Sequence, residues 1–253
     1  MESTPPRDPA AQAMTRLTRR AFLAGGLAAG AGFAGWRWLR TRTAAEGIPW
    51  PLRSAHRFNE RLGRGLYSNG RLAPEYDPAR AGLPIVNGSH GMPSAPLASS
   101  WTLSVIQPDR ATRIFTPADT ASLVRVEMTT ELKCIEGWSQ IVMWGGVRLA
   151  DFVAAHELGR RPDGSAYDYL ALTTSDGNYY VGLDTPSGLH PQTLLCDSMN
   201  GAPLTHGHGA PLRVVLTVKY GIKNIKWLGR LEFTDNRPAD FWAERGYDWY
   251  SGL

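Results

Sequence analysis

The sequence predicts an α+β fold, and two patterns support this prediction. From Trp101 onward the chain shows short runs of alternating apolar and polar residues, which are typical of strands. A stretch with helical spacing, Val147–Leu158, interrupts these runs and closes at Gly159. Strands and helices are interspersed without the regular rhythm of a doubly wound sheet, so mixed sheets with a few helices are favoured.

The expected elements follow from local signals along the chain. Ser175-Asp176-Gly177-Asn178 lies between two apolar runs and predicts a tight hairpin turn. No segment repeats at any fixed period. We expect helices at Ser54–Leu66 and Val147–Leu158, and strands at Trp101–Ile106, Leu123–Met128, Tyr167–Leu172, Tyr179–Leu183, Leu212–Val218 and Ile225–Phe233.

Three regions are expected from length and composition. A chain of 253 residues suits one domain with additions. Residues 1–45 form a leader, 46–100 an N-terminal extension that packs on the core, and 101–253 the main domain. The net charge of +4 resides in the leader, because residues 1–45 carry seven Arg and two acids whereas the rest carries 20 basic and 21 acidic residues. A nucleic-acid-binding body is therefore disfavoured.

The leader has the pattern of a twin-arginine export signal. Arg19-Arg20 is followed by Phe22-Leu23 and an uncharged, Ala/Gly-rich stretch that ends at Trp36. A basic amphipathic helix or a short membrane anchor is the alternative, although sixteen uncharged residues are short for a span of roughly 20. Thr43-Ala44-Ala45 offers small residues for cleavage, and an uncleaved tether stays open. Export in the folded state favours a protein loaded with a cofactor.

The common nucleotide and hydrolase motifs are missing, so the two cysteines are the first candidates for chemistry. Cys134 follows an expected strand, enters a turn with Gly137 and Trp138, and has Lys133 beside it, which suits a nucleophile or a soft-metal ligand. A buried small side chain, or a disulfide with Cys196, is the alternative. Cys196 itself is expected to fill the core.

Basic residues near the C-terminus predict an anion site. Three of only four lysines, Lys219, Lys223 and Lys226, share one Gly-containing segment, which suggests a cradle for an anion such as phosphate, unless it is a solvated loop. His208 and Arg213 flank a Pro-initiated strand and suit one polar ligand. The His206/His208 pair lacks a third ligand at the usual spacing for zinc.

Three motifs in order resemble the sulfite-oxidase-type molybdopterin-dependent oxidoreductases. Lys133-Cys134-Ile135-Glu136-Gly137-Trp138-Ser139 is similar to the cysteine motif of that family. The stretch from Met199 to Arg213 and the stretch from Tyr220 to Leu228 are similar to its later motifs. The resemblance covers roughly Trp101 to Gly246, and its simpler periplasmic members, such as the catalytic subunits of bacterial methionine-sulfoxide reductase systems, are the most similar type.

The resemblance implies the mixed sheets and helices of the family fold, holding one molybdenum on a molybdopterin dithiolene. Cys134 would then be the catalytic residue and the protein ligand of the metal, because a soft thiolate suits molybdenum. The residues implied in cofactor binding are Asn87, His90, Thr174, His208, Arg213, Asn224, Ile225 and Lys226. Of these, Asn87 and His90 come from a region that matches the family weakly.

The resemblance also implies a function and partners. The expected activity is a two-electron oxygen-atom transfer on a small oxo-substrate such as a sulfoxide or sulfite. Electrons would be exchanged with a separate b- or c-type cytochrome in the periplasm, and a monomer is the default because no dimerisation domain follows. The rival hypothesis is a non-catalytic periplasmic anion- or pterin-binding protein with a Cys134–Cys196 disulfide.

Overall fold

The computed structural model describes residues 9–41, 48–82, 85–97, 101–107 and 109–253. These residues divide into two compact units, Met1–Ala55 and His56–Leu253, and the division falls within helix α2 (Trp50–Leu66). The expected division at residues 45 and 100 stays a prediction. The cleavage signal at residues 43–45 lies outside the described residues.

The first unit consists mainly of α1 (Pro9–Thr41), a single helix of 33 residues. It contains the twin arginines and continues through five glycines in spite of their low helix propensity. Within the described residues, no helix is long and apolar enough to cross a membrane. The export signal remains a prediction from the sequence.

The first of two five-stranded sheets in the second unit has the order β2-β1-β10-β5-β6. Its strands are β1 (Leu103–Ile106), β2 (Thr112–Phe115), β5 (Tyr169–Thr174), β6 (Tyr180–Asp184) and β10 (Leu228–Thr234). β1 and β10 pair in parallel, whereas all other pairs are antiparallel. The hairpin predicted around Gly177 connects β5 to β6, and Gly177 has φ +76°, a value that glycine adopts readily.

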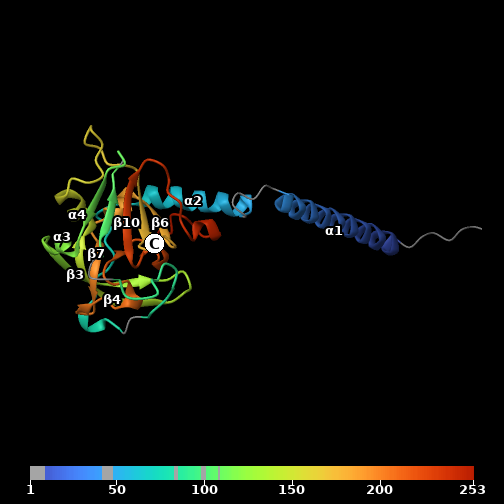
Figure 1. Cartoon of the computed structure of the whole chain (residues 1–253). Coiled ribbons are helices and arrows are strands. Elements are labelled where there is room, and N and C mark those ends of the chain that lie inside the picture. The colour runs from blue at the N-terminus through green and yellow to red at the C-terminus, as the bar shows by residue number, and fades with distance from the viewer. Residues whose placement is uncertain (1–8, 42–47, 83–84, 98–100, 108) are drawn as a thin grey trace, which may run out of the picture. The chain divides into compact units, whose positions relative to one another are not determined.

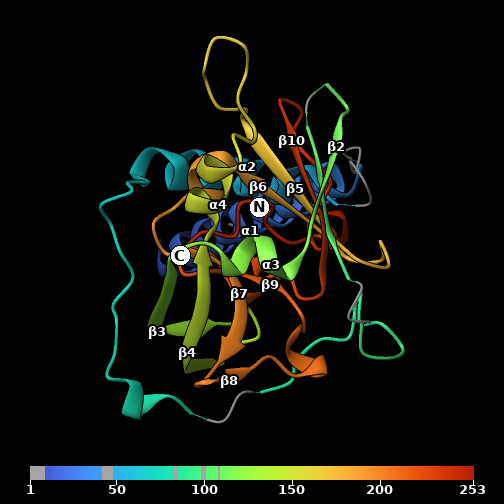
Figure 2. The same ribbon diagram turned by 60° about the vertical axis from the view of Figure 1, so that its left-hand side comes forward.

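The second sheet has the order β3-β4-β7-β8, with β9 also paired to β7. Its strands are β3 (Arg125–Lys133), β4 (Ser139–Arg148), β7 (Thr193–Met199), β8 (Ala202–Pro203) and β9 (Arg213–Leu216). All of its pairs are antiparallel. Figure 2 shows this sheet below the first one, with β3, β4, β7 and β8 side by side.

Both faces of the second sheet are covered, because alternate residues of its strands enter different cores. Leu195 and Val214 belong to the large core shared with the first sheet, whereas Leu194, Cys196 and Val215 belong to a smaller core on the other face. The period of two in a strand explains this division. Cys196 is fully buried there, as the sequence predicted.

Short helices and 3-10 turns connect the strands. They are η1 (Pro78–Arg80), α3 (Pro117–Ala121), α4 (Leu149–Ala155), α5 (Thr185–Gly188), η2 (His206–His208), η3 (Gly221–Lys223) and η4 (Ala243–Arg245). α4 is shorter than expected, because Val147 and Arg148 continue β4 and pair with β7. Mixed sheets with helices confirm the predicted α+β class.

The chain between α2 and β1 follows the edge of the second sheet. Tyr76 N donates to Thr129 O of β3 at 2.9 Å, and Gly82 N donates to Ile141 O of β4 at 3.0 Å. In Figure 2 this blue-green segment runs past β3 and on below the sheet. Its continuation, residues 85–90, reaches the turn that carries Cys134.

Candidate functional site

A cavity of about 170 Å³ lies beside the turn that connects β3 to β4. Six segments between residues 85 and 247 form its wall, so the cavity exists only in the folded chain. The residues that line it are Ile85, Asn87, Gly88, His90, Leu132, Cys134, Ile135, Glu136, Trp138, Tyr179, His208, Arg213, Gly221, Ile222, Asn224, Lys226, Trp227, Trp242 and Tyr247.

Cys134 is the first residue after β3 and is held by a tight turn. Its backbone N–H donates to Trp138 O at 2.9 Å, and its carbonyl accepts from Gly137 N at 3.2 Å. Gly137 has φ +89°, which a residue with a side chain rarely adopts, so the glycine of the motif permits the turn. The thiol is partly exposed and lies on the cavity wall.

The surroundings of the thiol favour its protonated form when no metal is bound. Burial raises the pKa of Cys134, and the Glu136 carboxylate raises it further. Asn87 Nδ2 lies 3.9 Å from Cys134 Sγ and 3.1 Å from Glu136 Oε2, so the weakly matching segment does reach the cysteine. Lys133 was expected to act on the thiol, but it pairs with Glu131 at 3.7 Å. A metal ion would therefore have to displace the thiol proton.

Arg213 is the most buried cation of the cavity wall. Its guanidinium donates to the backbone carbonyls of His208 and Asn224, both at 3.2 Å, and lies 4.9 Å from the centre of the Trp144 ring. Its Nε has no hydrogen-bond partner among the described residues. Burial lowers the pKa of Arg213 to about 10. A buried cation without a carboxylate partner has the chemistry to bind an anion.

Lys226 stands near Arg213 on the same wall. Its ammonium donates to the carbonyls of Asn87, Gly88 and Gly207 at 2.7–3.0 Å, and thereby ties the segment 85–90 to the C-terminal motif. Burial, followed by the charge of Arg213, lowers the pKa of Lys226 to about 8. Within the described chain, neither cation has a carboxylate at ion-pair distance.

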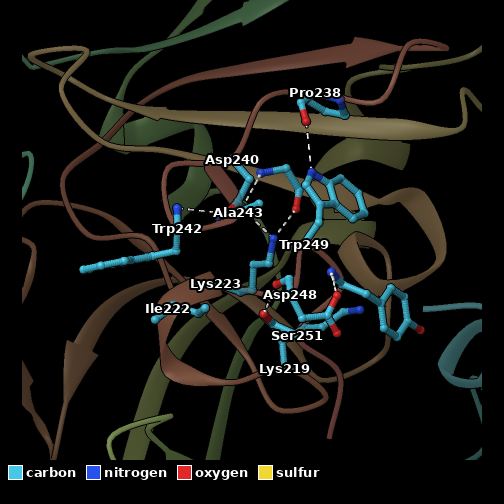
Figure 3. Close-up of polar contacts among 12 residues, drawn as sticks. Lys219, Ile222, Lys223, Pro238, Asp240, Trp242, Ala243, Asp248, Trp249 and Ser251 are labelled. Atoms are coloured by element: carbon cyan, nitrogen blue, oxygen red, sulfur yellow. Dashed lines mark hydrogen bonds and ion pairs between the residues drawn. The ribbon is translucent and has the colours of Figure 1, made fainter. Parts of the chain in front are cut away.

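Lys219 and Lys223 do not belong to this site, which corrects the prediction of a three-lysine anion cradle. Lys223 Nζ lies 2.5 Å from Asp240 Oδ2 and donates to Gly182 O at 2.9 Å, as Figure 3 shows for the pair. Lys219 Nζ lies 3.4 Å from Asp184 Oδ1 and 3.0 Å from the centre of the Tyr250 ring. Both lysines are buried, and each is paired with an aspartate inside the fold. The sequence could not show this, because both aspartates are distant along the chain.

The two neighbouring histidines point to different places. His208 lines the cavity and is buried, with Nδ1 2.7 Å from Thr205 Oγ1. His206 Nε2 lies 3.0 Å from Pro93 O, outside the cavity wall. His90 lines the cavity opposite and packs against Phe241 and Trp242, with ring centres 4.7 and 5.7 Å apart. The described residues contain no group of three or more His, Cys, Asp or Glu arranged for a metal ion.

Three other predicted residues have structural partners of their own. Asn224 touches the cavity, but its side chain bonds to the backbone of Leu216 and Tyr220. Ile225 is fully buried in the large core and does not line the cavity. Thr174 is also absent from the wall, because its hydroxyl donates to Asp176 Oδ1 at 2.6 Å. Gly91, next to His90, packs closely on Thr174.

The sequence did not identify several aromatic and acidic residues of the wall. Glu136 accepts from Trp138 Nε1 at 3.0 Å, and both lie within the cysteine motif, so their nearness to Cys134 was available as a signal. Tyr179 donates to Ile222 O at 2.5 Å, and burial raises its pKa. Tyr247 lies on a C-terminal loop without a recognisable motif. Only the fold brings it to the cavity.

The predicted alternative of a Cys134–Cys196 disulfide is wrong, because both cysteines are free. Cys196 lies in the smaller core and is the cross-strand neighbour of Arg213 in the β7–β9 pair. Burial raises the pKa of Cys196 to about 11, which keeps it an unreactive thiol.

Comparisons with known proteins identify the family. Residues 90–242, more than half of the chain, match the family described as oxidoreductase molybdopterin binding domain. The chain therefore belongs to this family and is an oxidoreductase, which confirms the resemblance drawn from the motifs.

Individual relatives give a consistent result. An Azospira oryzae protein named as protein-methionine-sulfoxide reductase subunit YedZ1 is 30% identical over 83% of this chain and 79% of its own length. The protein-methionine-sulfoxide reductase catalytic subunits MsrP of Ralstonia nicotianae and Xanthomonas campestris are 29% and 34% identical over 60% and 47% of this chain. The matches span 50% and 39% of these two relatives.

A solved structure supports the fold. The sulfane dehydrogenase SoxCD from Paracoccus pantotrophus superposes with a TM-score of 0.50 over 57% of this chain and 41% of its own, at 20% identity. The predicted fold of the sulfite-oxidase type is thereby confirmed.

Proposed function

We propose that the chain is a molybdenum–molybdopterin oxidoreductase that reduces a sulfoxide by two electrons and two protons, yielding a thioether and water. The observation that carries the proposal is one cavity with the motif thiol Cys134 on one wall and two carboxylate-free cations, Arg213 and Lys226, on another. A soft metal and a phosphate-bearing organic ligand need these two kinds of group. The names of the relatives favour a sulfoxide over sulfite.

Each wall has a proposed role. Cys134 would ligate the metal, and Asn87 would hold its sulfur in place from 3.9 Å. Arg213, Lys226 and His208 would bind the phosphate and the polar edge of the pterin, with His90 and Asn224 completing the wall. Thr174 and Ile225 would act from behind this wall. When bound, the cofactor would supply a metal centre that exchanges two electrons and an oxygen atom with the substrate.

Aromatic side chains around Cys134 would lower the polarity of the surroundings of the metal. Trp138, Trp242 and Tyr247 line the cavity around Cys134 and, with the cofactor in place, would limit the access of water to it. Low local polarity strengthens the hydrogen bonds and charges that orient the substrate.

The leader and the redox partner complete the proposal. Arg19 and Arg20 would direct export of the folded, loaded protein to the periplasm. Electrons would come from a separate b- or c-type cytochrome. The names of the relatives, which describe them as subunits, support a separate electron-donating protein.

The test is the molybdenum and pterin content after expression in a host with twin-arginine export. We expect about one of each per chain in the wild type, and loss of molybdenum in Cys134→Ser with pterin partly retained. Thr112→Ser, at an exposed position of β2 that does not line the cavity, is the control and should keep both.

Activity follows with a peptide methionine sulfoxide and a reduced dye as electron donor. Full loading without sulfoxide reduction would overturn the substrate and retain the cofactor. Well-folded wild-type protein with neither molybdenum nor pterin would overturn the whole proposal and favour an anion-binding protein.

A further inference from the structure

The part of α2 in the second unit, residues 56–66, turns an acidic side chain toward the protein and three large apolar side chains away from it. Glu60 is buried, with 8% of its surface exposed, whereas Phe58, Leu62 and Leu66 are 51–59% exposed. The last three are spaced by four residues, so they follow one another along one side of the helix, about 40° apart. We call them the Phe58–Leu66 stripe. A surface helix normally turns its apolar side inward.

Specific contacts fix this orientation. Glu60 forms ion pairs with Arg64 at 3.1 Å and with Arg237 at 2.8 Å. Gly63 packs on the Tyr250 ring so closely that a Cβ would come within 2.5 Å of it. Figure 1 shows the end of α2 against the β-rich body. The stripe is therefore held outward by the ion pairs of the buried Glu60 and by the close contact of Gly63 with Tyr250.

The stripe continues into an open apolar cavity of about 610 Å³. Leu62 and Leu66 line it together with Leu72 and Leu253, which are also about half exposed. Tyr67 and Tyr247 line it as well and add amphipathic rings. A continuous exposed apolar surface of this kind marks a contact with a partner or a membrane.

The charges around the stripe are mainly positive. Arg57 and Arg61 lie beside it on α2 and are exposed, and Arg71 lines the cavity. The acids nearby are engaged within the protein: Glu60 faces inward, and Asp248 accepts from Tyr250 N at 3.1 Å. A basic rim around apolar side chains is complementary to a surface that is anionic outside and apolar beneath.

We propose that the Phe58–Leu66 stripe binds an anionic lipid surface. Phe58, Leu62 and Leu66 enter the boundary between headgroups and acyl chains, and Arg57 and Arg61 contact the lipid phosphates. A basic amphipathic helix with large apolar residues has the composition of such interfacial helices, and tyrosines are common at the same depth.

This binding would place the candidate active site near the membrane. Ile135 and Tyr247 line both the large cavity and the cavity of Cys134, so the two spaces share a wall. The inference about lipid binding is independent of the proposed reaction. Loss of molybdenum would leave it unchanged.

The experiment is flotation of the full chain with vesicles of phosphatidylcholine alone, with vesicles that contain one quarter phosphatidylglycerol, and with vesicles prepared from native membranes with their proteins. The α1 helix is present in every variant, so differences report on α2. We expect binding only to the anionic vesicles, an at least tenfold loss for Phe58→Gln/Leu62→Gln, and about a fivefold loss for each of Arg57→Gln and Arg61→Gln. Salt should weaken the binding.

The matched controls are Ile114→Gln/Val124→Gln, which alter apolar side chains of similar exposure elsewhere, and Arg230→Gln. These should bind like the wild type. Three results would overturn the proposal: unchanged binding of Phe58→Gln/Leu62→Gln, binding only to vesicles that contain native membrane proteins, or lipid-free self-association that the same variant abolishes. The second would indicate a membrane protein and the third a second copy of this chain.

Discussion

Two pairs of cations from the same C-terminal region differ in the groups that face their charges; Lys219, Lys223 and Arg213 are buried, and Lys226 is half-buried. Lys219 and Lys223 each face a buried aspartate, whereas Arg213 and Lys226 are bonded to backbone carbonyls. Among the described residues no carboxylate reaches the second pair. The sequence presents the four residues as one basic segment, and the fold separates them into a pair that faces aspartates and a pair that lines the cavity, which we propose to be the binding pair.

The difference shows how a fold marks an anion site. Moving a charge out of water costs several kcal/mol, which a partner of opposite sign must offset. Asp240 fulfils this role for Lys223, and its other oxygen accepts from the backbone of Trp242 and Ala243. Arg213 and Lys226 have no such carboxylate among the described residues, so the cost of removing their charges from water is offset by carbonyl groups. A phosphate-bearing cofactor would supply the missing anion.

The largest effect is expected where the compensating charge is removed. Asp240→Asn should lower the free energy of unfolding by about 3–5 kcal/mol, because Lys223 would stay buried without its counter-ion. Urea unfolding measures it. Asp235→Asn, which breaks the more exposed pair with Arg161, should cost no more than about 1 kcal/mol. Equal losses in both variants would show that the buried Lys223–Asp240 pair contributes no more to stability than the exposed Arg161–Asp235 pair.

Arg213→Met tests the binding pair. It should reduce the affinity for the pterin cofactor by about 10- to 100-fold, because charge-assisted hydrogen bonds to an anion are lost. The unfolding free energy of the cofactor-free protein should change by no more than about 2 kcal/mol, since two carbonyls lose a donor but no carboxylate loses its partner. Pterin retained after gel filtration and urea unfolding measure the two effects, with Arg230→Met as control.

A large loss of stability combined with normal pterin retention would place Arg213 among the structural cations. The comparison would then rest on Lys226 alone.

Lys226 makes anion binding sensitive to pH. Because burial lowers its pKa to about 8, the ammonium is charged below that pH and neutral above it. The affinity of the cofactor-free protein for sulfate, an anion of constant charge, should therefore fall as pH rises through about 8, by at most about tenfold per pH unit. Calorimetry between pH 6.5 and 9 measures it. Lys226→Arg should flatten the profile, and an equally steep profile in that variant would assign the pH dependence elsewhere.

The smallest effect concerns Cys134, which has a carboxylate neighbour in place of a cation. Burial, and after it Glu136, raises the pKa of this thiol. Glu136→Gln should therefore increase the rate of Cys134 alkylation in cofactor-free protein at pH 8 by roughly a few-fold. Glu127→Gln, on an exposed site of β3, should leave the rate unchanged. A slower reaction in Glu136→Gln would show that Glu136 acts as a base for the thiol.

Local features of the fold could be predicted because short stretches of chain determine them. The β5–β6 hairpin follows from Asp176 and Gly177, and the position of Cys134 after β3 follows from the alternation before it and Gly137 behind it. The C-terminal end of α2 was also predicted correctly, at Leu66. The limits of α4 were not, because pairing of Val147 with β7 outweighed its helical spacing.

The sequence by itself determined the family, the α+β class, the position of Cys134 in a turn after a strand and the basic character of the C-terminal motifs, because these are properties of residue type and local order. Only the tertiary structure decided which cations face the cavity, which acid neutralises each of the others, and that residues 85–90 reach Cys134. Those outcomes depend on contacts between residues that are distant along the chain. Asn87 and Cys134, for example, are more than forty positions apart. Long-range packing, and not local spacing, sets the burial and the partners of a charge.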